Sequence, residues 1–145
     1  MRNLRTFSVA SLLALFVFAA IGCNVSTANL SSLKTSKDKD GKTESAGFKS
    51  GETLYAKAAV SNNPGKVKVK LYLVADNVKG MTAGDTLKGS EVTVDVDGDG
   101  WASYSVPVSE AFAAGTYKLN ADMINDAGEK KDSKTAAVTI AEAGE

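Results

Sequence analysis

Three aspartates at alternate positions form the pattern in this chain that most invites a chemical interpretation. Asp95, Asp97 and Asp99 are interleaved with valine and glycine and are followed by Gly100. Carboxylates with this spacing open the loops that wrap Ca²⁺, because hard oxygen ligands must surround the ion. The closing ligand is missing, since Val106 stands where a bidentate glutamate belongs. A hairpin turn with positive-φ residues is therefore the favoured interpretation, and a weak calcium site is the alternative.

One tryptophan and a row of lysines are the other candidate ligand-binding residues. Trp101 could stack on a sugar ring, although a lone tryptophan at the start of a strand usually packs against its neighbours. Lys66, Lys68 and Lys70 alternate along one predicted strand, and Lys118 joins them if its own strand pairs there. Such a stripe could meet an acidic polysaccharide or lipid head groups. More often it is a solvated face that keeps sheets from associating.

Acid–base and metal chemistry are restricted by what the sequence lacks. The chain contains no histidine and a single cysteine. Neither a Ser-His nor a Cys-His nucleophile can therefore be assembled, and the imidazole ligands of most zinc, copper and iron sites are missing. Paired carboxylates could hydrolyse a glycoside, but they need a deep cleft with aromatic walls, and aromatic residues are few. We expect a protein that is not an enzyme and that has no cofactor, calcium excepted.

The single cysteine, Cys23, follows an apolar run at residues 9–22 that is preceded by Arg2 and Arg5. A basic start, a short apolar stretch and small residues before the cut are typical of a secretory signal, and the run is too short to span a bilayer comfortably. A lone thiol in an oxidising compartment has no disulfide partner in the chain. We expect a signal peptide over residues 1–22 and a short polar tether over residues 23–29.

The segment Ala20-Ile21-Gly22-Cys23 resembles the lipobox of bacterial lipoproteins, with alanine at the position where leucine is usual. The resemblance implies cleavage before Cys23, acylation of the new N-terminus and attachment to a membrane through lipid. The alternative is an ordinary secretory leader with an incidental cysteine. Asn24 replaces the aspartate that tends to retain such proteins at the inner membrane. The resemblance thus implies the bacterial cell envelope, and the periplasmic or surface face of its outer membrane.

From about residue 52 onward, apolar and polar side chains alternate in successive segments with turn residues between them, which predicts strands. The clearest strand is predicted at residues 66–73. The stretch that follows alternates less regularly, and residues 78–89 are interpreted as an insertion. Pro107 predicts an edge position for its strand, because proline has no N–H to donate. A first strand at residues 30–37 and a corner near Phe48 bring the count to seven or eight. Residues 30–145 are expected to form one all-β domain.

The turn after the first predicted strand repeats the calcium ambiguity more weakly, through Asp38, Asp40 and Gly41. The same residues are also those that favour a tight turn. The turn is again the favoured interpretation.

The C-terminal third carries the most specific fold signal. Gly115-Thr116-Tyr117 opens a predicted strand, and residues 125–129 form a loop before the last one. The combination resembles the closing hairpin of bacterial immunoglobulin-like domains, and residues 51–62 resemble the cell-adhesion-related CARDB domains. The resemblance implies an immunoglobulin-like sandwich of about seven or eight antiparallel strands, in which Tyr117 is the tyrosine-corner residue. It transfers no binding residue.

Charge balance narrows the choice of partners. The whole chain has 17 basic and 17 acidic residues, and a leader containing Arg2 and Arg5 would leave a small acidic excess in the remainder. This argues against nucleic acid, whose binding proteins carry a basic excess. The favoured function is a lipid-anchored interaction or structural module of the cell envelope that contacts a protein or polysaccharide. The alternative is a carbohydrate-binding or calcium-dependent adhesion module that uses Trp101 and neighbouring tyrosines. The patterns do not fix the oligomeric state.

Overall fold

The described part of the chain contains eight strands, and the longer ones, such as those at Thr53–Ser61 and Lys66–Val78, form where apolar and polar residues alternate. The computed structural model describes residues 27–142, and this part of the chain contains no helix. In chain order the strands are β1 (Asn29–Ser36), β2 (Gly47–Phe48), β3 (Thr53–Ser61), β4 (Lys66–Val78), β5 (Val92–Asp97), β6 (Gly100–Pro107), β7 (Gly115–Ile124) and β8 (Lys130–Ile140). No segment between residues 27 and 142 is a helix long and apolar enough to cross a bilayer.

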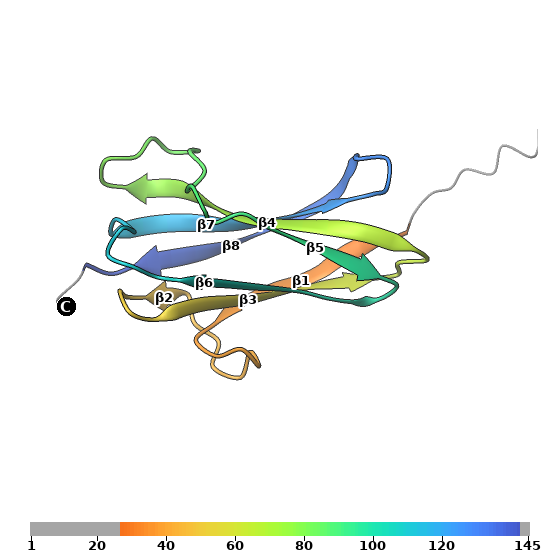
Figure 1. The fold of residues 1–145 in the computed structure, drawn as a ribbon, viewed down its shortest axis with the longest axis horizontal. Coiled ribbons are helices and arrows are strands. Elements are labelled where there is room, and N and C mark those ends of the chain that lie inside the picture. Colours follow the sequence, from red (N-terminus) through yellow and green to blue (C-terminus); the bar gives the residue numbers. More distant parts are fainter. Residues whose placement is uncertain (1–26, 143–145) are drawn as a thin grey trace, which may run out of the picture.

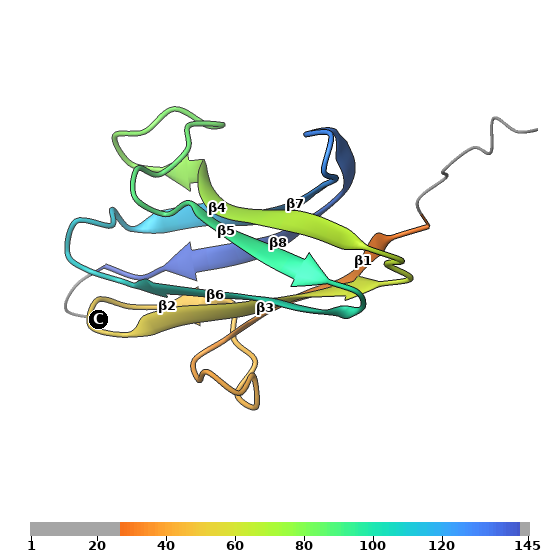
Figure 2. The ribbon, with the colours of Figure 1, turned by 45° about the vertical axis from the view of Figure 1, so that its right-hand side comes forward.

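The strands form two sheets that face each other, as Figures 1 and 2 show. The smaller has the order β1-β3-β6 and the larger the order β2-β8-β7-β4-β5. The predicted immunoglobulin-like sandwich is confirmed, with one difference. β2 pairs with β8 in parallel, at Gly47 with Thr139 and Phe48 with Ile140. After β1 the chain crosses between the sheets through residues 37–46 and arrives beside β8 running in the same direction.

The core lies between the inward faces of the two sheets, where the sequence pattern places it. Leu54 and Ala58 of β3 and Val69, Leu71 and Leu73 of β4 are completely buried. Burial of a side chain such as leucine or valine contributes roughly 1.5–3 kcal/mol each to folding, before the cost in entropy. The small sheet also ends on β6, so the edge position predicted from Pro107 is confirmed.

β4 continues five residues beyond the segment that alternation predicts, and the stretch interpreted as an insertion folds back onto it. The amide of Leu87 donates to the carbonyl of Leu73 (2.8 Å), and the amide of Ala75 donates to the carbonyl of Asp85 (2.8 Å). These bonds give the end of β4 partners that the shorter β5 does not provide. The loop is therefore part of the sheet's hydrogen bonding, which alternation alone does not reveal.

Tyr117 lies at the start of β7 with its ring buried in the core. Its hydroxyl donates to the carbonyl of Ala113, 2.8 Å away and four residues upstream. This is the geometry of a tyrosine corner, in which one side chain joins the core to the loop that precedes its strand. Burial raises the pKa of the Tyr117 hydroxyl.

Asp38 organises the loop that leaves β1. Its carboxylate accepts the backbone amides of Lys42 (3.0 Å) and Thr43 (2.5 Å). The amide of Lys42 is the main cause that lowers the pKa of Asp38 to about 2. The carboxylate oxygens of Asp38 therefore stabilise the turn, which supports the turn interpretation of this segment. The Asp40 carboxylate lies 3.6 Å from the ammonium of Lys42 in a solvent-exposed pair.

Acidification is expected to release this loop at a defined pH. Because the pKa of Asp38 is lower in the folded chain, its contribution is complete above the ordinary aspartate value of about 3.9 and is lost as the pH falls through about 2. The amide chemical shifts of Lys42 and Thr43 should titrate with a midpoint near 2, and the Asp38→Asn variant should not show this titration. A midpoint near 4 contradicts the assigned hydrogen bonds.

Candidate functional site

The Asp95–Asp99 pattern forms the β5–β6 hairpin, and its third carboxylate is used by the neighbouring turn. Asp99 Oδ1 accepts the backbone amide of Asn63 (2.8 Å), and Asn63 Nδ2 donates to the carbonyl of Gly98 (2.8 Å). Gly98 has a φ of 69°, which supports the turn interpretation. The buried Asn63 thus joins the β3–β4 and β5–β6 turns, a role that sequence reasoning missed.

The other two aspartates point outward from β5 and face lysines of β4. Asp95 lies 3.1 Å from the ammonium of Lys68, and Asp97 lies 4.0 Å from that of Lys66. The three carboxylates therefore serve three different partners. Across residues 27–142, no group of three or more acidic, cysteine or histidine side chains converges in a way that could hold a metal ion.

Calcium is expected to leave the thermal stability of this protein unchanged. A ligand that binds only the folded state raises stability in proportion to the logarithm of its concentration over Kd, so a specific site would raise Tm at millimolar ion. Calorimetric scans with and without CaCl₂ at about 5 mM should superimpose. This concentration lies above the Kd of about 10⁻⁴–10⁻³ M that is typical of weak extracellular calcium sites. A rise of several degrees that is absent in the Asp97→Asn variant contradicts this expectation.

The predicted basic stripe exists as a row of side chains, but each lysine has an acidic neighbour. β4 pairs with β7, so Lys118 lies on the same outward face as Lys66, Lys68 and Lys70. Lys70 lies 2.9 Å from Glu91 and Lys118 lies 2.7 Å from Asp76. Exposed pairs of this kind add little to stability and largely cancel the local field. The arrangement supports the solvated-face interpretation.

Trp101 is the one large hydrophobic side chain between residues 27 and 142 that stands exposed, with 59% of its surface accessible. Trp101 is therefore less covered than a tryptophan at the start of a strand usually is. On β6 Trp101 lies opposite Ala59 of β3, which lies opposite Ser32 of β1. Both neighbours are small, and the indole ring lies exposed on the outer face of the three-stranded sheet.

The neighbouring tyrosines expected to assist Trp101 are mostly elsewhere. Tyr104 and Tyr117 are buried in the core, and Tyr72 lies on the outer face of the other sheet, where its hydroxyl donates to Asp122 (2.9 Å). Tyr55 alone shares the sheet face of Trp101, and it pairs with Ser105, four positions further along β6. The exposed aromatic surface is therefore centred on one ring.

Two open grooves flank Trp101, and its side chain lines both of them. One has a volume of about 360 Å³ and includes charged side chains of β1, β3 and the loop after β1, namely Lys34, Asp40, Glu44 and Lys57. The other has a volume of about 370 Å³ and is lined by small and polar residues, among them Ser31, Ser32, Ser61 and Asp99. Both volumes fall in the range of roughly 300–1,000 Å³ that is usual for small-ligand sites.

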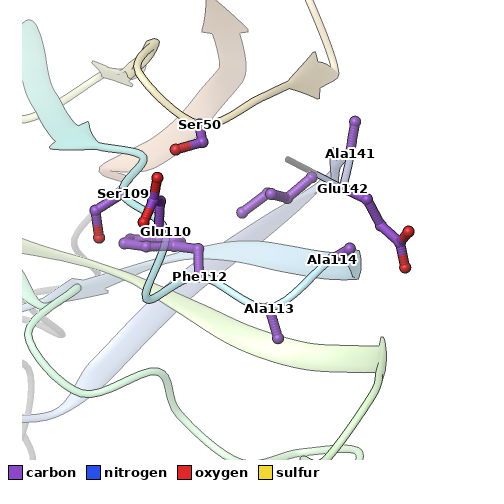
Figure 3. A pocket seen from close by; sticks show the side chains of 9 residues that line it. Ser50, Ser109, Glu110, Phe112, Ala113, Ala114, Ala141 and Glu142 are labelled. Atoms are coloured by element: carbon purple, nitrogen blue, oxygen red, sulfur yellow. The ribbon is translucent and has the colours of Figure 1, made fainter. Parts of the chain in front are cut away.

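A third hollow, of about 340 Å³, lies at the end of the sandwich where β8 finishes (Figure 3). Its lining combines apolar side chains, among them Phe112 and Ala114, with the polar side chains of Ser109, Glu110 and Glu142. Ser109 Oγ accepts the amide of Ala111 (3.3 Å), so the hydroxyl serves the local turn. Among the hydrogen bonds of residues 27–142, the Ser109 hydroxyl contacts no other side chain.

A buried polar link between the sheets was also missed by sequence reasoning. Tyr104 of β6 donates to the carbonyl of Ser90 (2.8 Å), and Ser90 Oγ accepts the amide of Leu73 (3.0 Å). Both side chains are at most 2% exposed. Burial raises the pKa of the Tyr104 hydroxyl far above its ordinary value. In the sequence, Ser90 is a polar residue just before a strand. It cannot be distinguished there from an ordinary loop serine.

The predicted lipid attachment residue, Cys23, lies outside the described residues. The first described position, Thr27, donates its hydroxyl to the carbonyl of Asn62 (3.0 Å) and so lies against the β3–β4 turn. β1 then begins at Asn29, one residue before the predicted start of the domain.

No protein-family model matches the chain, and no curated protein is similar to it in sequence. Among solved structures, the chain is similar to a Niemann-Pick type C2 protein from the Japanese carpenter ant. The two share 16% sequence identity, the match covers 79% of this chain and 92% of the ant protein, and the TM-score is 0.47.

Proposed function

We propose that this protein is a lipid-anchored, non-catalytic interaction module of the bacterial cell envelope. Support for the anchor comes from the sequence, where the lone Cys23 follows an apolar run and completes a lipobox-like segment. Support for the interaction role comes from the fold, because a two-sheet sandwich presents two outer faces and several loops to a partner. The observation that carries the binding part is Trp101 on the outer sheet face, where 59% of its surface is accessible.

The position of the chain start sets the orientation that an anchor at Cys23 would impose. Figure 1 shows β1 beginning at the same end of the sandwich as the β3–β4 and β5–β6 turns, and the C-terminal end of β8 at the opposite end. Thr27 follows Cys23 by four positions, and a fully extended chain spans at most about 14 Å over four such steps. The turns at residues 62–65 and 98–99 would then lie nearest the membrane. The loops at residues 79–91 and 108–114 would point away from it.

Fractionation of a bacterial host that expresses the full chain tests the anchor. The wild-type protein should sediment with membranes and require detergent for release, because acyl chains provide about 0.8 kcal/mol per buried methylene. The Cys23→Ser variant should lose the membrane association, and Asn24→Ser, a matched polar change next to the cysteine, should retain it. A wild-type protein that is fully released by a salt wash overturns the anchor.

The choice of membrane is tested by a second variant. In a diderm host, the wild-type chain should band with the outer membrane on a density gradient, and Asn24→Asp should shift it to the inner membrane. Identical banding of the two proteins at the inner membrane removes the outer-membrane assignment and leaves the anchor unaffected.

A further inference from the structure

We propose that the outer face of the three-stranded sheet is a saccharide-binding site centred on Trp101, and that its ligand is a polysaccharide without carboxylate or phosphate groups. This inference rests on the proposed interaction role and names the ligand class of that surface. It does not depend on acylation of Cys23.

The first argument is the cost of leaving this indole in water. Full burial of a large apolar side chain stabilises a protein by roughly 1.5–3 kcal/mol, and the domain forgoes most of this at Trp101. Every other large hydrophobic side chain between residues 27 and 142 is at least partly buried. Aromatic rings that are presented on a rigid strand beside small residues, here Ala59 and Ser32, offer an open apolar face to a planar ligand. The C–H face of a pyranose ring is such a partner.

The second argument is the chemistry of the groove between β1, β3 and the loop after β1. The ammonium of Lys34 lies 2.6 Å from Glu44, and that of Lys57 donates to the carbonyl of Asp40 (3.1 Å). These contacts keep charged donors and acceptors in the lining of the groove. Neighbouring sugar hydroxyls, each a donor and an acceptor, can bond to both kinds of group, and hydrogen bonds to charged groups are the stronger ones.

The groove on the other side of Trp101 extends the same chemistry. Its lining includes the hydroxyls of Ser31 and Ser61, which are hydrogen-bonded to each other at 2.9 Å, and the Asp99 carboxylate. Because one ring lines both grooves, a chain of sugar units could pass from one to the other over the indole. The site is therefore shaped for an oligosaccharide more than for a single sugar.

The charge of the two grooves selects among ligands. Lys34 is paired with Glu44, and the Asp40 carboxylate faces Lys42. Lys57 contacts the backbone carbonyl of Asp40, and Asp99 adds a further carboxylate. An acidic polysaccharide or an anionic bilayer would meet at least as many carboxylates as ammonium groups, and like charges repel. A neutral or amino-sugar chain meets no such penalty. The observations thus favour a saccharide over a membrane as the occupant of this face.

Trp101 is the only tryptophan in the chain, so its fluorescence reports on this site alone. Purified mature protein should be titrated with tetrasaccharides of β-1,4-glucose, β-1,4-N-acetylglucosamine, α-1,4-glucose and β-1,4-galacturonate, at up to about 10 mM, ten times the Kd of a weak site. At least one neutral saccharide should give a saturable change in emission. No response to any neutral saccharide overturns the proposal, as does a response to galacturonate alone.

Calorimetric titration with the responding saccharide then assigns the residues. Trp101→Ala should remove binding, and Glu44→Gln should weaken it about tenfold, which corresponds to about 1.4 kcal/mol. Tyr72→Ala, which removes an outward aromatic from the other sheet, is the matched control and should bind like the wild type. Equal affinity of Trp101→Ala and wild type overturns the site.

Anionic phospholipid vesicles provide the competing test. A shift of Trp101 emission with vesicles, and with no saccharide, assigns the face to the membrane and overturns the proposal. Both titrations can be done with the Cys23→Ser protein, which carries no acyl chain. A negative saccharide result therefore does not affect the proposed anchor, and a failed anchor test does not affect the saccharide result.

Discussion

Replacement of Gly115 by alanine is expected to lower the free energy of unfolding by about 3 kcal/mol, at the upper end of the cost of overpacking. Gly115 opens β7 opposite Val78, with a φ of 147° that side chains rarely adopt. A Cβ at this position would lie 2.8 Å from Val78 Cα and closer still to the backbone carbonyl of Asn77. Because both obstacles are backbone atoms, β4 and β7 would have to separate to admit a methyl group.

The control for Gly115→Ala is the same substitution at Gly128. Gly128 also has a positive φ, 82°, but a Cβ there meets no atom within 4 Å. Alanine at this position should therefore cost only the backbone term, about 1–2 kcal/mol. Urea unfolding of the three proteins measures the difference. Equal midpoints for the two variants would show that the contact with β4 is unimportant.

The second large effect is expected at Tyr104, where removal of the hydroxyl alone should cost about 1–3 kcal/mol. Tyr104→Phe keeps the ring in the core and leaves the buried carbonyl of Ser90 without its donor. An unsatisfied buried acceptor loses its hydration without compensation, which is the source of this cost. Denaturant unfolding should show a lower midpoint with an unchanged slope. Tyr55→Phe on the outer face is the control and should change stability by less than about 0.5 kcal/mol.

The same tyrosine makes stability depend on alkaline pH. Burial raises the pKa of Tyr104 in the folded chain, so the unfolded chain loses this proton first as the pH rises above about 10. Stability should then fall with rising pH, and the fall should be shallower in Tyr104→Phe. An identical alkaline profile in the two proteins contradicts the assigned burial of the hydroxyl.

The strands could be predicted from the sequence because their inward and outward residues alternate with period two. This holds for β3 and β4, whose buried faces are continuous. It fails for β2, since two residues are too short to show a period, and for the parallel pairing of β2 with β8, which depends on how the chain crosses between sheets. The fold of residues 79–91 onto β4 depends on backbone bonds, which carry no side-chain signature.

The candidate site was less predictable than the fold. The residue types at Trp101 and at the three aspartates are visible in the sequence, but their exposure and partners are set by residues distant along the chain. Asp99 accepts an amide 36 residues away, and the strand neighbours of Trp101 are Ala59 and, beyond it, Ser32. The spacing of residues along the sequence does not predict which distant residues will lie beside them.

The mass of the N-terminal peptide from protein extracted from host membranes tests the central claim most directly, that this sandwich is tethered to lipid at its front end. The account predicts a first residue at Cys23 whose mass exceeds that of unmodified cysteine by the acyl groups it carries. A peptide that still begins at Met1, or one cut elsewhere with a free Cys23 thiol, contradicts it.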